Sequence, residues 1–116
     1  MKPGIKRHCD IQRSLEERLK GYGYKVYSNI EYYAGNDKHH GRTIGEIDVM
    51  AFVPNPDGSI KRINIYEVKS GKNGDYRHAK EQLNRAEEYI SKSNSLPINK
   101  VYVGRVEGDL LVRRVR

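Results

Sequence analysis

Tryptophan is absent from this chain of 116 residues, and cysteine and phenylalanine each occur once. The single cysteine, Cys9, excludes an intrachain disulfide and a zinc site built from cysteines, and it suits a reducing cytosol. No apolar run approaches the ~18 residues of a membrane span, and the N-terminus lacks the apolar stretch of a signal peptide. We therefore expect a cytoplasmic protein with one domain over residues 1–116, since domains usually hold about 100–200 residues.

Acidic residues are fewer than basic ones, at 15 against 22, so the net charge is +7. An excess of this size on a small domain favours a polyanionic partner such as nucleic acid, although an ordinary basic surface is the alternative. The nine tyrosines can form the edge of a core, an interface or stacking platforms. No basic amphipathic segment carries a wide apolar face, which argues against a membrane partner.

Hydrophobic periodicity divides the chain into helices and strands. Apolar residues recur every three to four positions over residues 8–20 and 75–91, which predicts two amphipathic helices. A turn signal at 55–58 joins two predicted strands in a hairpin. The order α-β-β-β-α-β-β is typical of an α/β or α+β domain with one mixed sheet flanked by helices. β-Branched and aromatic residues predict the strands over 25–33, 43–53, 60–69, 100–106 and 110–115.

Acidic side chains interrupt the two strands of the predicted hairpin, with Asp48 in the first and Glu67 in the second. Glu67 should share its face with Lys69, because side chains alternate across a strand with a period of two. By the same rule Asp48 shares a face with Glu46, and the opposite face carries Ile47, Val49, Ala51 and Val53. If the hairpin is paired in this way, the carboxylates of the two strands converge.

Converging carboxylates repel each other, and a divalent cation offsets that repulsion. Mg²⁺ and Mn²⁺ prefer oxygen ligands, so we expect Asp48, Glu67 and the main-chain carbonyl of Val68 to bind one of them. Lys69 can then polarise the attacking water or stabilise charge on phosphorus. Glu67 and Lys69 alone could equally form an ion pair on a strand surface, but the acids of the preceding strand favour a catalytic site.

The segments GEIDVMA (45–51) and IYEVKS (65–70) resemble the signature of PD-(D/E)XK nucleases. Among these, they are most similar to archaeal Holliday-junction resolvases and YraN-like predicted endonucleases, and the resemblance covers most of the chain. It implies a restriction-endonuclease-like core that hydrolyses DNA with one or two Mg²⁺ or Mn²⁺ ions. It also implies Asp48 and Glu67 as metal ligands and Lys69 as the catalytic lysine. Cleavage of a branched substrate would require a homodimer, because so small a domain covers one scissile bond.

The sequence departs from this family on the first helix, where such relatives usually carry a metal-assisting Glu. Counting back from the Gly-Tyr pair after that helix reaches Gln12, which could hydrogen-bond a water on the metal. Glu16 and Glu17 are better explained as solvated helix residues. Glu46 is a candidate to assist Asp48, and Gln82 falls where related nucleases place a Gln near the site, with an ordinary surface position as the alternative.

Basic and polar residues around this site are expected to contact phosphates, although each could also lie on a solvated surface. Such contacts fix the position of the nucleic acid and make binding depend on salt, and nothing in the sequence predicts readout of bases. The candidates lie near the N-terminus, in the loop after the first strand and around the start of the second helix: Lys6, Arg7, His39, His40, Arg42, Lys72, Tyr76, Arg77 and Lys80.

These observations predict a metal-dependent DNA endonuclease without a small-molecule cofactor. Resolution of Holliday junctions is a more specific expectation that rests on the family resemblance. Two alternatives remain open. The first is a nucleic-acid-binding module that has kept the fold and lost efficient catalysis, which the Gln at position 12 favours. The second is a nuclease that acts on RNA, which fits the charge and the tyrosines.

Overall fold

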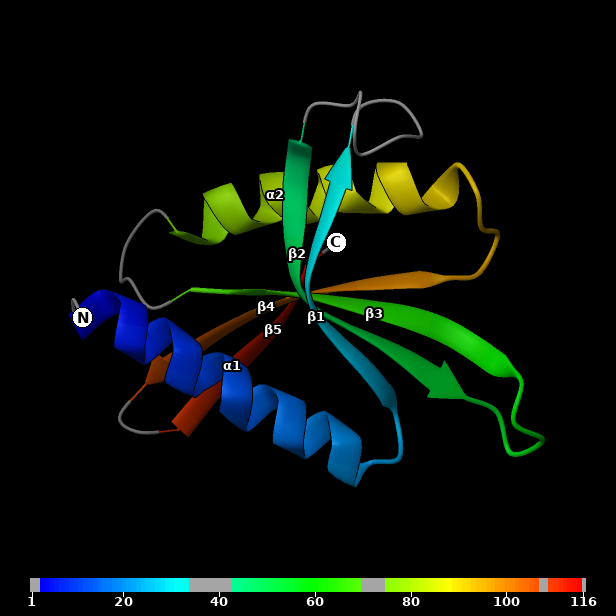
Figure 1. Cartoon of the computed structure of the whole chain (residues 1–116), viewed down its shortest axis with the longest axis horizontal. Coiled ribbons are helices and arrows are strands. Elements are labelled where there is room, and N and C mark those ends of the chain that lie inside the picture. The colour runs from blue at the N-terminus through cyan, green and yellow to red at the C-terminus, as the bar shows by residue number, and fades with distance from the viewer. Residues whose placement is uncertain (1–2, 34–42, 70–74, 107–108, 116) are drawn as a thin grey trace.

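The computed structural model describes residues 3–33, 43–69, 75–106 and 109–115. All seven expected elements occur, and α1 begins five residues earlier than its periodicity predicts, with Pro3 at a first-turn position that suits proline. Neither described helix is long and apolar enough to cross a membrane. Along the chain the elements are α1 (Pro3–Gly21), β1 (Lys25–Tyr33), β2 (Thr43–Pro54), β3 (Ile60–Val68), α2 (Asp75–Ser91), β4 (Ile98–Val106) and β5 (Asp109–Val115) (Figure 1).

The strands form one five-stranded mixed sheet in the order β1-β2-β3-β4-β5. β2 pairs antiparallel with both β1 and β3, so the expected hairpin of β2 and β3 is confirmed. β3 and β4 are parallel, and α2 supplies the crossover that a parallel pair requires. β5 returns antiparallel to β4. The protein is therefore an α+β domain in which two helices flank a mixed sheet.

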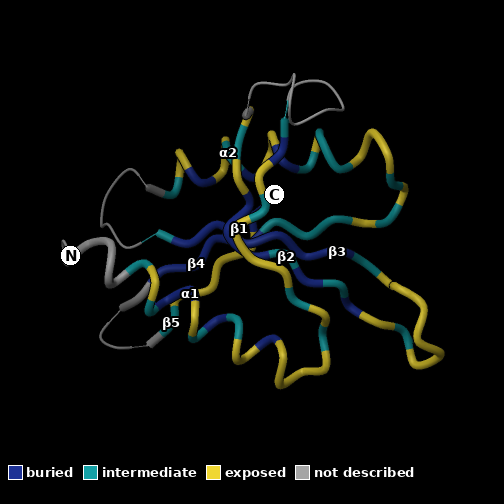
Figure 2. Tube along the Cα trace, viewed as in Figure 1, coloured by how far each residue is buried: buried dark blue, intermediate teal, exposed yellow. Residues whose placement is uncertain are grey.

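Each helix covers one face of the sheet with its own hydrophobic core (Figure 2). Alternate residues of β3 divide between the two cores as expected, with Tyr66 and Val68 towards α1 and Ile63 and Ile65 towards α2. The core on the α1 face contains Ile11, Leu15, Leu19, Val49, Ala51, Tyr66, Val68, Val101 and Val103. The core on the α2 face contains Tyr32, Ile47, Ile63, Ile65, Ala79, Leu83, Ala86, Tyr102 and Val115.

The paired strands β1 and β2 bend away from β3 towards α2 halfway along their length (Figure 1). Asn29 stands at the bend with a left-handed backbone (φ 53°), a conformation that Asn tolerates better than most residues. The bend moves Ile47 into the core on the α2 face, whereas Val49 remains in the core on the α1 face. The expectation that Ile47 and Val49 share a face is therefore wrong, because strict alternation holds only along a regular strand.

Gly45 lies beyond the bend, under the ring of Tyr32 on the adjacent strand. A Cβ atom at position 45 would approach the Tyr32 hydroxyl oxygen to 2.5 Å, so this position requires glycine while the ring stays in place. Tyr32 in turn packs against Tyr89 of α2, with 4.8 Å between ring centroids. Gly45 thus allows the bent parts of β1 and β2 to pack on α2.

Candidate active site

Four polar side chains are buried among the described residues, and three of them meet where β2 leaves β3. Asn64 is the exception, and its amide donates a hydrogen bond to the Tyr66 hydroxyl at 3.0 Å. Gln12, Asp48 and Glu67 form the other group, with exposed fractions of 7%, 8% and 5%. Buried carboxyl groups are costly unless they are paired or bind a cation, so this cluster is a functional candidate.

The carboxylate of Asp48 takes the place of a main-chain acceptor at the point where the β2–β3 ladder opens. Regular pairing ends at Val49 opposite Tyr66, and beyond it the Val68 N–H donates to Asp48 Oδ2 at 2.8 Å. The N–H and C=O groups of one strand residue point to the same side. The Val68 carbonyl therefore lies on the same side of β3 as Asp48.

Glu67 lies beside Asp48, close enough for the charge of one carboxyl group to act on the other. The pKa of Glu67 is raised from 4.5 to about 8, mainly by burial and secondly by the charge of Asp48. Lys69 acts in the opposite direction, with its Nζ 3.5 Å from Glu67 Oε1. The structure therefore brings Asp48, Glu67 and Lys69 together, and the raised pKa of Glu67 favours its protonated form near neutral pH.

Gln12 reaches this cluster from α1, but it contacts the main chain of Asp48 rather than its carboxylate. Its Nε2 donates to the Asp48 carbonyl oxygen at 3.2 Å, with Asn29 Oδ1 at 3.1 Å and Glu16 Oε1 at 3.3 Å. Glu16 also accepts a hydrogen bond of 2.6 Å from Ser28 Oγ. Plain solvation is therefore wrong for Glu16, because its carboxylate helps to orient the Gln12 amide, whereas Glu17 is exposed as expected.

His8 is the site residue that the sequence analysis missed. Its Nε2 lies 3.5 Å from Asp48 Oδ2, and its side chain is 34% exposed. His8 precedes Gln12 by four residues, so the two share one face of α1, and this spacing is the signal that could have identified it. A cavity of about 240 Å³ opens beside them, and it is lined by His8, Cys9, Gln12, Arg13, Glu16 and Asn29.

Two other candidate catalytic residues lie apart from the contacts of Asp48 and Glu67. Glu46 is exposed on β2 and stands opposite Glu31 of β1. Among the described residues, no contact joins Glu46 to Asp48 or Glu67. Gln82 is half-buried on α2, and its Oε1 is buried without a hydrogen-bond partner in the described part of the chain. A buried amide oxygen normally has a donor, so Oε1 of Gln82 keeps its capacity to accept a hydrogen bond.

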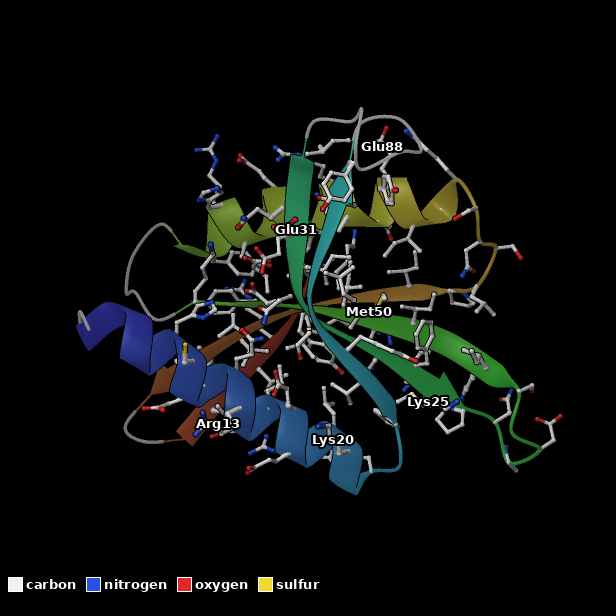
Figure 3. The ribbon with its side chains drawn as sticks, viewed as in Figure 1. Arg13, Lys20, Lys25, Glu31, Met50 and Glu88 are labelled. Atoms are coloured by element: carbon white, nitrogen blue, oxygen red, sulfur yellow. The ribbon has the colours of Figure 1, made fainter. Side chains whose placement is uncertain are left out.

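The candidate phosphate contacts on α2 differ in their exposure and in their contacts. Tyr76 is held between Arg113, whose guanidinium carbon lies 3.9 Å from the ring centroid, and Tyr102, with 5.6 Å between ring centroids. Arg77 and Lys80 are exposed, and Arg77 pairs with Glu81 at 3.8 Å. Arg13 and Lys20 project from α1 into solvent (Figure 3). The side chains of Lys6, Arg7, His39, His40, Arg42 and Lys72 lie outside the described residues.

The residues of the site fit a hard divalent cation. Asp48, Glu67 and the Val68 carbonyl provide oxygen donors, which Mg²⁺ and Mn²⁺ prefer. A bound cation would also offset the repulsion between the two buried carboxylates. No three His, Cys, Asp or Glu side chains form a ready-made metal cage within the described ranges.

Comparison of the chain with models of protein families, with curated proteins and with solved structures finds no match. The family resemblance is therefore supported only by the two short segments that carry it. Asp48, Glu67 and Lys69 are therefore the residues whose geometry bears on function.

Proposed function

We propose that this protein is a metal-dependent endonuclease that hydrolyses phosphodiester bonds in DNA, built on a restriction-endonuclease-like core. One observation carries the proposal: two acids from adjacent strands are buried side by side, with a lysine 3.5 Å from one of them. A structural ion pair needs one acid and one base, and the second buried acid would then only add repulsion. A cation that binds both acids explains why the second acid is present.

Asp48, Glu67 and the Val68 carbonyl would hold the ion. When bound, it supplies Lewis acidity to the phosphate and makes water a better nucleophile at neutral pH. Lys69 is placed to orient the attacking water, and its charge offsets the charge that accumulates on the phosphate oxygens. Glu67 must lose its proton before it can act as a ligand, and the nearby Lys69 ammonium assists that loss by favouring the carboxylate.

DNA is the proposed substrate because the chain carries a net charge of +7, and basic side chains stand exposed on both helices. Arg13 lines the cavity beside Gln12, and Arg77 and Lys80 lie in the first turns of α2. Such side chains bind the phosphate backbone without reading sequence. Branched DNA, including Holliday junctions, is the more specific proposal, and it requires a homodimer to cut two strands.

A binding module without efficient catalysis is the second candidate, and the geometry of Gln12 favours it. A family acid at that position would contribute a negative ligand, whereas Gln12 donates its amide hydrogen to the Asp48 main chain. The protein would then hold a cation with one carboxylate fewer. A nuclease that acts on RNA would use the same site, and cleavage of matched DNA and RNA hairpins separates the two substrates.

The test is nicking of supercoiled plasmid and cleavage of a synthetic four-way junction with Mg²⁺ or Mn²⁺. We expect Glu67→Gln to reduce cleavage by at least ~100-fold, within the range usual for loss of an essential group in an active site. Glu17→Gln is the matched control, because Glu17 is exposed on α1. This variant should cleave DNA like the wild type. Cleavage that Glu67→Gln leaves unchanged would refute the proposed site. Tight junction binding without cleavage by the wild type would support the binding module.

A further inference from the structure

Three neighbouring strands place Glu67, Tyr102 and Arg113 in one row across the sheet. Glu67 of β3 pairs with Tyr102 of β4, and Tyr102 pairs with Arg113 of β5. Paired residues have their side chains on the same face, and Tyr102 belongs to the core on the face that α2 covers (Figure 1). Because neighbouring strands are about 4.8 Å apart, the main chain of Arg113 lies about 10 Å from that of Glu67.

The first turn of α2 holds the side chain of Arg113 on this face. The guanidinium carbon lies 3.9 Å from the ring centroid of Tyr76. The Tyr76 ring packs edge-on against Tyr102, with 5.6 Å between ring centroids and 76° between ring planes. Tyr102 is buried, so the ring under Arg113 is supported by the core. An arginine held in this way loses less side-chain entropy on binding a ligand than an unsupported surface arginine does.

The charge of Arg113 is available to an anion. Arg113 is exposed, and no carboxylate pairs with it among the described residues. Arg77, next to Tyr76 on α2, differs in this respect because it pairs with Glu81 at 3.8 Å. A guanidinium presents a planar fork of N–H donors that matches two oxygens of a phosphate, and stacking on an aromatic ring leaves that fork intact.

We propose that Arg113, held on the ring of Tyr76, binds a phosphate of the DNA strand close to the phosphodiester that is cut. Tyr76 is then a positioning residue and does not contact the phosphate itself. This inference rests on the proposed nuclease function. Phosphates of one strand follow one another every ~3.4 Å along the duplex axis, so a span of about 10 Å from Glu67 reaches a phosphate within about three nucleotides of the cut.

The first test is binding of the full chain to a labelled linear duplex and a four-way junction over a series of salt concentrations, with a chelator to prevent cleavage. We expect Arg113→Gln to weaken binding of both by about 10-fold, and to reduce the dependence on salt by about one phosphate contact. Arg114→Gln is the matched control. It removes the same charge from the next residue of β5, which lies on the opposite face and is hydrogen-bonded to Asn99 at 3.1 Å. This control should bind within ~2-fold of the wild type and keep its salt dependence.

Variants of Tyr76 test whether the ring acts through Arg113. Tyr76→Leu removes the ring and should weaken binding by ~3-fold or more, whereas Tyr76→Phe keeps the ring and should retain the binding that Tyr76→Leu loses. The double variant with Tyr76→Leu and Arg113→Gln should bind no more weakly than Arg113→Gln alone. Losses that add in the double variant would overturn the positioning role, because they would show that Tyr76 contacts DNA independently of Arg113.

Cleavage of the junction with Mg²⁺ or Mn²⁺ separates this inference from the proposed function. Arg113→Gln should raise KM by about 10-fold and change kcat by less than ~3-fold, since it removes a binding contact away from the bond that breaks. Cleavage by the wild type with an unchanged KM and salt dependence in Arg113→Gln, or with equal losses in Arg114→Gln, would overturn the inference and preserve the proposed function. Binding that depends on Arg113 without cleavage by the wild type would support the phosphate contact and refute the nuclease. Absence of DNA binding by the wild type, with and without Mg²⁺, would refute both.

Discussion

Glu67 should make the metal-free protein less stable as the pH rises, and Glu67→Gln should remove that dependence. The carboxyl of Glu67 is 5% exposed, and its pKa in the folded protein is raised to about 8 by burial and then by Asp48. The folded chain therefore holds this proton more tightly than the unfolded chain, which releases it near pH 4.5. By linkage, the stabilisation is fully present below about pH 4.5 and is lost as the pH rises to about 8.

The magnitude follows from the difference between the two pKa values. At about 1.4 kcal/mol for each unit of pH, the free energy of unfolding falls by up to about 5 kcal/mol across this range. This is an upper bound, because relaxation around the acid pair reduces the cost of ionisation. In Glu67→Gln the amide has nearly the same shape and does not titrate, so its stability should vary less with pH than that of the wild type.

The assay is denaturant unfolding at a series of pH values in the presence of a chelator. Asp48→Asn is the informative control: it removes the second cause of the raised pKa but not burial, the first, so it should reduce the slope without abolishing it. Parallel stability curves for the wild type and Glu67→Gln would refute the reasoning. That outcome would mean that Glu67 is ionised and fully compensated in the folded protein.

Three further predictions concern the same site. Binding of a divalent cation at pH 7 should release up to about one proton, because Glu67 must ionise; the binding enthalpy measured in buffers of different ionisation enthalpy checks this. Lys69→Met should reduce cleavage by ~100-fold or more while metal affinity stays equal or increases, and a parallel loss of both would contradict a role for Lys69 in catalysis. Gln12→Leu should lower the free energy of unfolding by about 1–3 kcal/mol, since it leaves the buried carbonyl of Asp48 unsatisfied; an unchanged unfolding midpoint would contradict this.

The sequence predicts the elements well because each carries a clear local signal. The helices have apolar stripes, the strands have β-branched runs, and the turn at 55–58 sets the hairpin. Asp48 and Glu67 could also be predicted to converge, since the register of a short hairpin follows from its turn. The observed pairing of Met50 with Ile65 places Asp48 at the depth of Glu67. This part of the site required only local rules.

The contacts of α1 could not be predicted in the same way, because they depend on how a helix packs over a sheet. His8 is 40 residues from Asp48 along the chain, and its spacing from Gln12 indicates a shared face of α1 but not a contact with Asp48. The orientation of Gln12 depends on three acceptors from different elements, which a sequence pattern does not display. Strict alternation predicts that Ile47 and Val49 share a face of β2. This prediction is wrong because the strand bends between these two residues.

The bend in β1 and β2 explains why Gln12 is hydrogen-bonded to the main chain of Asp48. Asn29 stands opposite Asp48 in a left-handed conformation that interrupts regular pairing, and a buried carbonyl that loses its ladder partner needs another donor. The Gln12 amide provides that donor, and Glu16 and Asn29 orient it. A glutamate at position 12 has no hydrogen to donate when ionised, so it would leave the Asp48 carbonyl unsatisfied and face it with a like partial charge. The amide at position 12 therefore follows from the main-chain geometry of β1 and β2, and His8 is the side chain of α1 that lies near the Asp48 carboxylate among the described residues.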